Sequence, residues 1–312
     1  MDSLFLAFSV VFPLFFHMSM GYGLRRLEIL DQHTLDVMNR LVFQFFLPVL
    51  LFINIYNTDL QSSVNLPLMA FAAIGILLVF AVLYWLVPRI EKENCRRGVL
   101  IQGIFRSNFI IFGIPVAAAI FGEGQIGPVA LLISVVVPLF NVLAVISLEM
   151  YREGTTEWSK ILKGVVTNPL ILASVFSIGF LLLNIRLPAF LEKSLADLAK
   201  VATPLALLLL GCSFHFSATR HCWRQVLTGV LGRLILVPVL LLPTAIMLGF
   251  RGLELAGLLA LFASPSAVSS FTMAKQMDGD SELAGQLVVY SSAFSILTMF
   301  LWIVILKQGN YI

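Results

Sequence analysis

The chain has 312 residues, of which 59% are hydrophobic and only 12% are charged, and its mean hydropathy is +0.98. Soluble domains carry about twice that share of charged residues, so the composition excludes a soluble globular protein and indicates a polytopic membrane protein. The net charge of +3 is small, and the 3 cysteines and 4 histidines have neither disulfide-framework nor metal-ligand spacing. We therefore expect no metal, no cofactor and no nucleic-acid partner.

Ten hydrophobic segments follow one another along the chain, each long enough to cross a bilayer. Their bounds are 4–24, 35–56, 66–88, 98–122, 126–150, 161–185, 190–214, 223–249, 253–276 and 283–306. No basic region precedes the first segment and no small-residue cleavage site follows it, so we interpret it as a retained span. The connections are short, which predicts that there is no separate soluble domain.

The basic residues are concentrated in alternate loops, and this asymmetry predicts the orientation. One set of loops holds Arg25, Arg26, Arg89, Lys92, Arg96, Arg97, Arg152, Lys160, Lys163, Arg220, Arg224 and Lys275. The other set holds only Arg186, Lys193, Arg251 and Lys307. The first set should face the cytoplasm, which places both termini outside in a multi-pass protein of the plasma (inner) membrane. The other basic residues fall within spans: Arg40, Arg106, Lys200 and Arg233.

The two halves of the chain share landmarks at a nearly constant offset. Pro13 and Pro169 are 156 residues apart, as are Pro48 and Pro204; Pro115 and Pro265 are 150 apart, and Gly124 and Gly279 are 155 apart. These landmarks favour a five-span unit used twice, although prolines are also common in unrelated spans. An odd number of spans inverts the second unit. We predict repeats at 1–150 and 161–312, joined by a cytoplasmic linker at 151–160.

Two segments carry residues that interrupt a membrane helix. The fourth contains the stretch 106–115, Arg-Ser-Asn-Phe-Ile-Ile-Phe-Gly-Ile-Pro, and the ninth contains 263–270, Ala-Ser-Pro-Ser-Ala-Val-Ser-Ser. Proline lacks an N–H and crowds the preceding turn, so we expect helix breaks near Pro115 and Pro265. Broken backbone at membrane depth is tolerated only inside protein or beside a wet cavity. Paired interruptions in the two halves of a transporter point to its substrate site.

The same stretches carry a family resemblance. Residues 108–115, Asn-Phe-Ile-Ile-Phe-Gly-Ile-Pro, resemble the fourth-span motif of the auxin efflux carrier family. Residues 265–275, Pro-Ser-Ala-Val-Ser-Ser-Phe-Thr-Met-Ala-Lys, resemble its ninth-span motif, and 149–152 and Asn168-Pro169 are also similar to the family. The resemblance covers the whole chain. Because the long central loop of the plant carriers is missing, the chain resembles a prokaryotic member of the family.

The resemblance implies an all-α membrane protein with ten transmembrane helices, a 5+5 inverted repeat and broken crossover helices 4 and 9. It also implies a secondary transporter, not an enzyme, for an organic anion such as malate, malonate or an auxin-like acid. Its partners would be this small anion, the lipid bilayer and, as one option, a second copy in a homodimer. The chain departs from the motif at Arg106 and Ser107 and in the serine-rich stretch 266–270.

The residues themselves allow anion binding. A helix that begins at a break has unpaired N–H groups and a positive partial charge, so two such starts can bind an anion. The Asn108 amide can donate to a carboxylate, and Arg106 can either balance a second carboxylate or extend to the cytoplasmic interface. The other candidates for substrate binding are Pro115, Ser264, Pro265, Ser266, Ser269, Gln44, Asn141 and Tyr290. Each serine taken singly is better explained by satisfying broken backbone.

Candidates for ion coupling or gating lie near the span ends: Asp197, Lys200 and Lys275. The spacing of Asp197 and Lys200 favours a structural ion pair, as does that of Asp36 and Arg40. Three functions stay open at this point. A carrier of organic anions is favoured, and the alternative is a sodium- or proton-coupled transporter of the bile-acid or cation-antiporter type, which usually keeps carboxylates at mid-membrane. The third is a receptor or channel without a transport cycle.

Overall fold

The computed structural model describes residues 2–57, 65–121, 127–152, 158–183, 185–215 and 218–312. Over these ranges the secondary structure is helical, with one isolated antiparallel bridge between Ser107 and Ser266. By length and composition, six helices can cross a membrane: Gln32–Tyr56, Leu66–Ile90, Leu131–Met150, Ala189–Ser213, Cys222–Met247 and Ser281–Gln308. The all-α polytopic class is therefore confirmed, and the other expected segments correspond to α1 and to pairs of shorter helices.

The first half of the chain has helices whose starts are set by side-chain caps. Asp31 accepts a hydrogen bond from the Thr34 N–H at 2.8 Å, and Asn65 accepts one from the Leu68 N–H at 3.1 Å. The elements of this half are α1 (Asp2–Arg26), α2 (Gln32–Leu41), η1 (Val42–Phe46), α3 (Leu47–Tyr56), α4 (Leu66–Ile90), α5 (Asn94–Phe105), α6 (Phe109–Phe121) and α7 (Gly127–Met150). The π-helical η1 joins α2 and α3 into one continuous helix.

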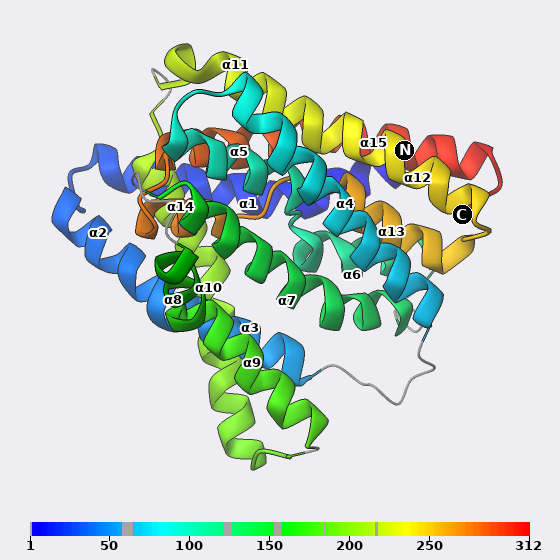
Figure 1. Cartoon of the computed structure of the whole chain (residues 1–312), viewed down its shortest axis with the longest axis horizontal. Coiled ribbons are helices and arrows are strands. Elements are labelled where there is room, and N and C mark those ends of the chain that lie inside the picture. The colour runs from blue at the N-terminus through cyan, green and yellow to red at the C-terminus, as the bar shows by residue number, and fades with distance from the viewer. Residues whose placement is uncertain (1, 58–64, 122–126, 153–157, 184, 216–217) are drawn as a thin grey trace.

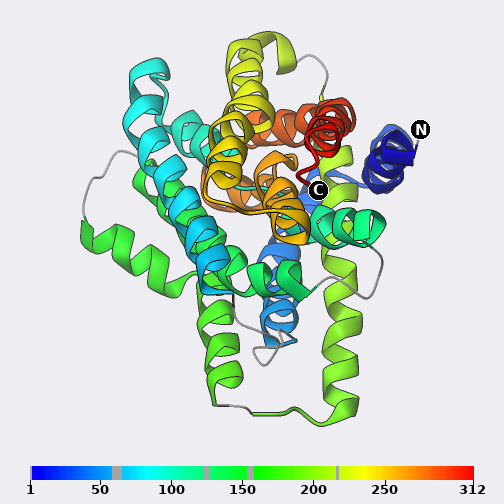
Figure 2. The same cartoon turned by 90° about the vertical axis from the view of Figure 1, so that its right-hand side faces the viewer.

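The second half begins with α8 at Trp158, inside the expected linker 151–160, half of which lies outside the described residues. Its elements are α8 (Trp158–Thr167), α9 (Pro169–Leu182), α10 (Ala189–Ser213), α11 (Ala218–Leu231), η2 (Gly232–Leu236), α12 (Val237–Met247), α13 (Gly252–Ala263), α14 (Ser269–Gln276) and α15 (Ser281–Gln308). The two chain ends lie on the same side of the molecule (Figure 1). Helices α9 and α10 project together beyond the other helices (Figure 2).

The expected sixth segment, 161–185, is divided into α8 and α9 at Asn168. Pro169 has no N–H to bond to a preceding turn, and its fixed φ suits the first position of a new helix. The Asn168 side chain caps that new start by accepting a hydrogen bond from the Leu170 N–H at 3.0 Å. The Asn168-Pro169 pair therefore begins α9 and reorients the chain between the two helices.

The two interrupted segments lie at the centre of the molecule. Helix α5 is buried from Gly98 to Phe105 and α13 from Leu255 to Ala263, so neither has a polar, solvent-facing side. The outer helices instead expose large apolar side chains, among them Phe12 on α1, Trp85 on α4 and Phe176 on α9. Such an apolar exterior suits a lipid environment. The interrupted helices are thus shielded by the others.

Helices α1 and α10 approach each other closely at two glycines. A Cβ added at Gly21 would lie 2.0 Å from the Leu208 carbonyl oxygen, and one added at Gly211 would lie 2.0 Å from the Met18 carbonyl oxygen. The Cys212 thiol also donates to the Gly21 carbonyl at 3.1 Å. Small residues at helix interfaces permit this backbone-to-backbone packing in membranes. The two glycines therefore allow α1 and α10 to pack backbone against backbone.

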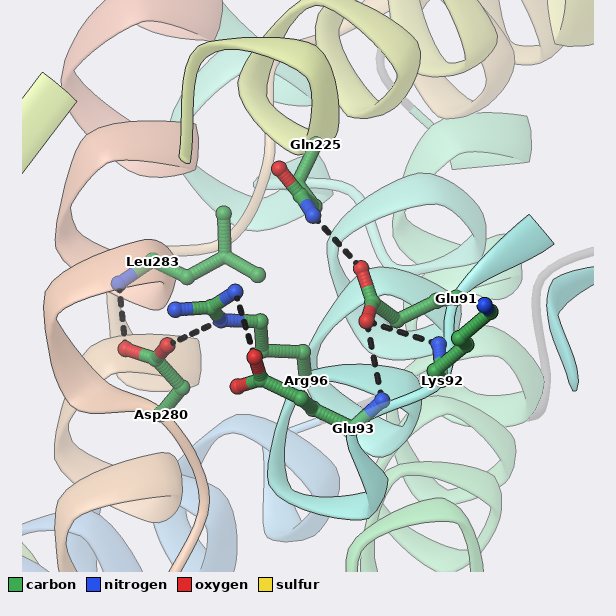
Figure 3. Close-up of polar contacts among 7 residues, drawn as sticks. All are labelled: Glu91, Lys92, Glu93, Arg96, Gln225, Asp280 and Leu283. Atoms are coloured by element: carbon green, nitrogen blue, oxygen red, sulfur yellow. Dashed lines mark hydrogen bonds and ion pairs between the residues drawn. The ribbon is translucent and has the colours of Figure 1, made fainter. Parts of the chain in front are cut away.

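A polar network joins α4, α5, α11 and α15 at the ends expected to face the cytoplasm (Figure 3). Arg96 pairs with Asp280 at 2.9 Å, and the Glu91 carboxylate accepts bonds from the Lys92 and Glu93 N–H groups and from the Gln225 amide. Burial raises the pKa of the Glu91 carboxyl, but the bonds from Glu93, Gln225 and Lys92 outweigh it and hold this pKa below its ordinary value.

Replacing Glu91 with glutamine should lower stability at neutral pH by about 1–2 kcal/mol, because a charged acceptor of three hydrogen bonds is lost. A lowered native pKa contributes stability above the unfolded pKa of about 4.3, and this contribution is lost as the pH falls through the native value. The difference in stability between wild type and Glu91→Gln should therefore become smaller below about pH 4. Melting temperatures of the two proteins across pH would measure it. Glu93→Gln is the control, since that side chain is 55% exposed.

Candidate functional site

The two helix breaks meet at a short paired segment. We call residues 106–108 and 264–268 the junction. The Asn108 N–H donates to the Pro265 carbonyl at 2.8 Å, and the Ala267 N–H donates to the Arg106 carbonyl at 3.3 Å. Residues 107 and 266 form the antiparallel bridge. Each unwound segment thus satisfies the backbone of the other, as buried backbone at membrane depth requires.

The prediction that a half-helix begins near Pro115 is wrong. The break lies at residues 106–108, α6 begins at Phe109, and Pro115 lies within α6. The first segment unwinds where its backbone pairs with the second, and a proline inside a helix costs local bonds without ending it. Pro265 does lie in a break, next to the bridging Ser266, so Pro115 and Pro265 are not equivalent positions. The landmark Gly124 lies outside the described residues.

A cavity of about 90 Å³ adjoins the junction. Its walls come from α3, α7, α9 and α10 and from the first turns of α6 and α14. The polar side chains that line it are Arg106, Ser107, Asn108, Asn141, Thr203 and Ser269; most of the remaining lining is aliphatic or aromatic. Among these described lining residues, Arg106 carries the charge and none is acidic. The cavity therefore has an apolar wall and a positive side.

Two helix starts strengthen this positive character. Helix α6 begins at Phe109 and α14 begins at Ser269, and both residues line the cavity. The first N–H groups of a helix lack acceptors within that helix and carry a positive partial charge. The expectation that α14 begins near Pro265 holds to within four residues. An anion in the cavity would be close to both helix ends.

Arg106 points into the protein and not toward an interface. Its residue is 5% exposed, Nη2 donates to the Asn141 Oδ1 at 2.6 Å, and Nη1 contacts the Met273 sulfur at 2.6 Å. Asn141 in turn donates to the Val137 carbonyl at 2.9 Å, which fixes its oxygen toward the arginine. No described carboxylate lies within ion-pair distance of Arg106. Of the two alternatives for this side chain, the interior position is the one observed.

Asn108 presents an amide donor without a protein partner. The residue is 8% exposed, and its Nδ2 is buried without a hydrogen-bond partner among the described residues. The neighbouring Ser107 hydroxyl is in the same condition. Leaving buried donors unpaired costs free energy, so native structures rarely do so without a reason. A ligand oxygen in the cavity would satisfy the Asn108 amide.

The predicted serines divide between the cavity and the backbone. Ser269 lines the cavity, whereas the Ser264 hydroxyl bonds to the Ala260 carbonyl and the Ser266 hydroxyl donates to the Gly103 carbonyl at 2.6 Å. The Ser266 N–H also donates to the Ser291 hydroxyl at 3.1 Å. The prediction of substrate contact at Ser264, Pro265 and Ser266 is therefore not supported, since their polar groups hold the junction together.

Two further predicted lining residues lie elsewhere. Gln44 is exposed on η1 and Tyr290 is half-buried on α15, and neither lines the cavity. Their central positions in the sequence of a span could not reveal which side of the helix they occupy. Asn141, predicted on the same grounds, does line the cavity.

The charged candidates near the span ends form ion pairs. Asp197 and Lys200 pair at 2.8 Å with both side chains exposed, which is the predicted structural pairing. The predicted pairing of Asp36 with Arg40 is wrong, because Asp36 pairs at 2.8 Å with Lys275. Lys275 is brought from α14 to α2 by the fold, so sequence spacing could not identify it as the partner.

One central residue was not predicted as functional. Arg233, on η2, is fully buried and donates to four backbone carbonyls at the junction side of α5 and α13. An arginine inside a predicted span was the available signal, because such a charge normally faces the protein interior. Its partners could not be predicted from the sequence, because they are backbone carbonyls, which every residue has.

Comparison with known proteins identifies the family. Its profile, described as membrane transport protein, matches residues 6–161 and 158–303. The chain belongs to the auxin efflux carrier family. This family consists of transporters, in agreement with the expectation of a non-enzyme, and among the described residues there is no cluster of side chains that could hold a metal.

Two prokaryotic relatives of this auxin efflux carrier family member are similar along nearly their whole length. One is an uncharacterized transporter of Methanothermobacter thermautotrophicus, 27% identical over 290 residues, which are 92% of this chain and 94% of the relative. The other is an uncharacterized transporter of Methanocaldococcus jannaschii, 25% identical over 293 residues, which are 90% of this chain and 93% of the relative. The chain is thus a multi-pass membrane transporter.

Proposed function

We propose that this transporter moves an organic anion across the membrane by alternating access, with the cavity at the junction as its substrate site. One observation carries the proposal: the cavity has two helix N-termini, the Arg106 guanidinium and the Asn108 amide, which has no partner among the described residues, but no acidic residue in its described lining. Donors and positive partial charges of this kind bind carboxylates. In this proposal α5/α6 and α13/α14 are the crossover helices of two inverted five-helix repeats.

The cavity walls suit an anion with an apolar part. Leu50, Leu51 and Phe140 supply hydrocarbon surface to the cavity lining. A monocarboxylate would place its charged end at Asn108 and the helix starts and its hydrocarbon part against this surface. A dicarboxylate would place its second charge near Arg106. The substrate classes are therefore auxin-like monocarboxylates and small dicarboxylates of the malate or malonate type.

The same lining favours transport without a coupled cation. Sodium- and proton-coupled carriers usually hold the ion on carboxylates inside the membrane. Here Asp197, the deepest acidic candidate in the sequence, is exposed and paired with Lys200. An inside-negative potential contributes about 2.3 kcal/mol per charge per 100 mV to anion export, so export needs no other driving ion. We propose electrogenic uniport, tested by flux into proteoliposomes at a clamped potential with imposed proton and sodium gradients.

Replacing Asn108 with alanine tests the site directly. We expect binding of mono- and dicarboxylates alike to weaken by about 1–3 kcal/mol, because the substrate oxygen loses its amide partner. Titrating purified protein with a panel of such acids, read by thermal shift and by uptake, measures the loss. Asn39→Ala is the matched control, since Asn39 is a buried amide on α2 outside the cavity lining. Equal losses in both variants would remove Asn108 from the site.

The proposed orientation places the network of Figure 3 in the cytoplasm and both termini outside. Cys95 is exposed at the start of α5, whereas Cys212 and Cys222 are buried, so Cys95 is the useful reporter. A membrane-impermeant thiol reagent should label it in inside-out vesicles and leave it unlabelled in intact cells. Cys95→Ser, which removes the reporter, controls for background. Labelling of intact cells at Cys95 would reverse the orientation.

A further inference from the structure

Arg233 is bound by the backbone of two helices at once. Its Nε donates to the Ser264 carbonyl at 2.7 Å and its Nη2 to the Leu261 carbonyl at 2.7 Å, both from the end of α13. Its Nη1 donates at 3.1 Å to each of the Ile104 and Phe105 carbonyls, which end α5. The residue is 0% exposed, and no described carboxylate lies within ion-pair distance of it.

These four oxygens belong to the negative ends of two helix dipoles. The last carbonyls of a helix lack partners within it and carry a negative partial charge. In transporters with broken helices, such half-helix ends and unwound carbonyls are the groups that coordinate a sodium ion or a proton. In this chain the guanidinium of Arg233 already makes the contacts that a bound cation would make there.

The local structure brings Arg233 to this place. It lies on the π-helical turn η2, and the preceding Gly232 packs against α5, where an added Cβ would come within 3.2 Å of the Ile104 side chain. The wider π turn and the absence of a side chain at residue 232 allow η2 to approach the ends of both broken helices. A guanidinium presents five N–H donors in a planar fork, which fits four carbonyls around one charge.

We propose that Arg233 is a resident cation of the transport cycle: it takes the place of a coupled ion at the C-terminal ends of the two half-helices and positions the junction for the anion. This inference rests on the proposed function, which it deepens. Arg106 and the helix starts attract the substrate on one side of the junction, while Arg233 neutralises the opposite helix ends on the other. The carrier then needs no external cation to assemble its site.

The test compares Arg233→Lys, which keeps the charge, with Arg233→Gln, which keeps similar length without it. Purified full-length proteins are melted in choline, sodium and potassium chloride without substrate. We expect the wild-type melting temperature to be the same in all three salts, Arg233→Gln to melt roughly 10 °C lower, and Arg233→Lys to recover a large part of that loss. Arg224→Gln, at an exposed arginine on α11, controls for loss of charge alone.

Equal melting of the Lys and Gln variants would overturn the proposal, because the charge would then have no role. If neither variant folds, the melting temperatures of the wild type in the three salts test the proposal. A higher wild-type melting temperature in sodium or potassium chloride than in choline chloride would show that an external cation is bound and would contradict the proposal. The same wild-type melting temperature in all three salts would support it. Since no substrate is added, failure to transport any carboxylate would refute the proposed function and leave this result intact.

Discussion

Replacing Arg106 with glutamine is expected to lower kcat/KM for dicarboxylates by about 10- to 150-fold, while monocarboxylates lose much less. A hydrogen bond to a charged group contributes about 1.5–3 kcal/mol, and about 1.4 kcal/mol corresponds to a tenfold change. The guanidinium is inside the protein, lines the cavity and has no described acidic partner, so a second substrate carboxylate would be its counter-charge. Uptake of radiolabelled acids into proteoliposomes measures both classes.

Two variants separate charge from geometry at this position. Arg106→Lys keeps the charge and should retain more dicarboxylate transport than Arg106→Gln. Asn141→Ala removes the oxygen that holds Arg106 at 2.6 Å and should weaken both classes less selectively. An equal loss of mono- and dicarboxylate transport in Arg106→Gln would exclude Arg106 from substrate selection and leave it a structural role.

Alanine at Gly21 or Gly211 should cost about 1–3 kcal/mol of stability or more, because overpacking a closely packed interface forces the backbone to move. In each case the new Cβ would lie 2.0 Å from a carbonyl oxygen of the facing helix, and a backbone atom cannot rotate away as a side chain can. The melting temperature should fall by several degrees in either variant. Differential scanning fluorimetry in detergent would measure the change.

Gly23 provides a control on the same helix. Among the described residues, no atom outside the local helix backbone lies within 4 Å of a Cβ added there. Gly23→Ala should therefore leave the melting temperature unchanged or raise it, because alanine is the better helix former. The melting temperature should thus fall for Gly21→Ala but not for Gly23→Ala. A fall of the same size at both positions would show that the close approach of α1 and α10 does not limit stability.

The fold class and the broken fourth and ninth segments could be predicted because both depend on local chemistry. Long apolar runs have to be helical in lipid, and polar residues and prolines inside such runs indicate that the helix is interrupted in that segment. The location of the fourth break could not be read in the same way. It is set by pairing with residues 264–268, which are distant in sequence, and the proline seven residues beyond Asn108 gave the wrong position.

Four residues that the sequence suggested for substrate binding line the cavity: Arg106, Asn108, Asn141 and Ser269. Their contact with substrate stays a prediction, and the partners of other charged residues could not be predicted. Asp36 was predicted to pair with Arg40, four residues later, but in the structure it forms an ion pair with Lys275. Arg233 was noted only as a charge within a span, since its partners are carbonyls that any sequence would provide.

The pairing at the junction has a mechanical consequence. Backbone hydrogen bonds connect residues 106–108 with 264–268, and the Ser266 hydroxyl and the Arg233 guanidinium add further bonds between the two broken helices. These polar groups are buried, so breaking the bonds would leave them unpaired. Separating the two broken helices would cost free energy, so they should move together as one rigid unit. The substrate would stay bound to this rigid unit. Access would alternate as the unit moves relative to the apolar walls that α3, α9 and α10 provide.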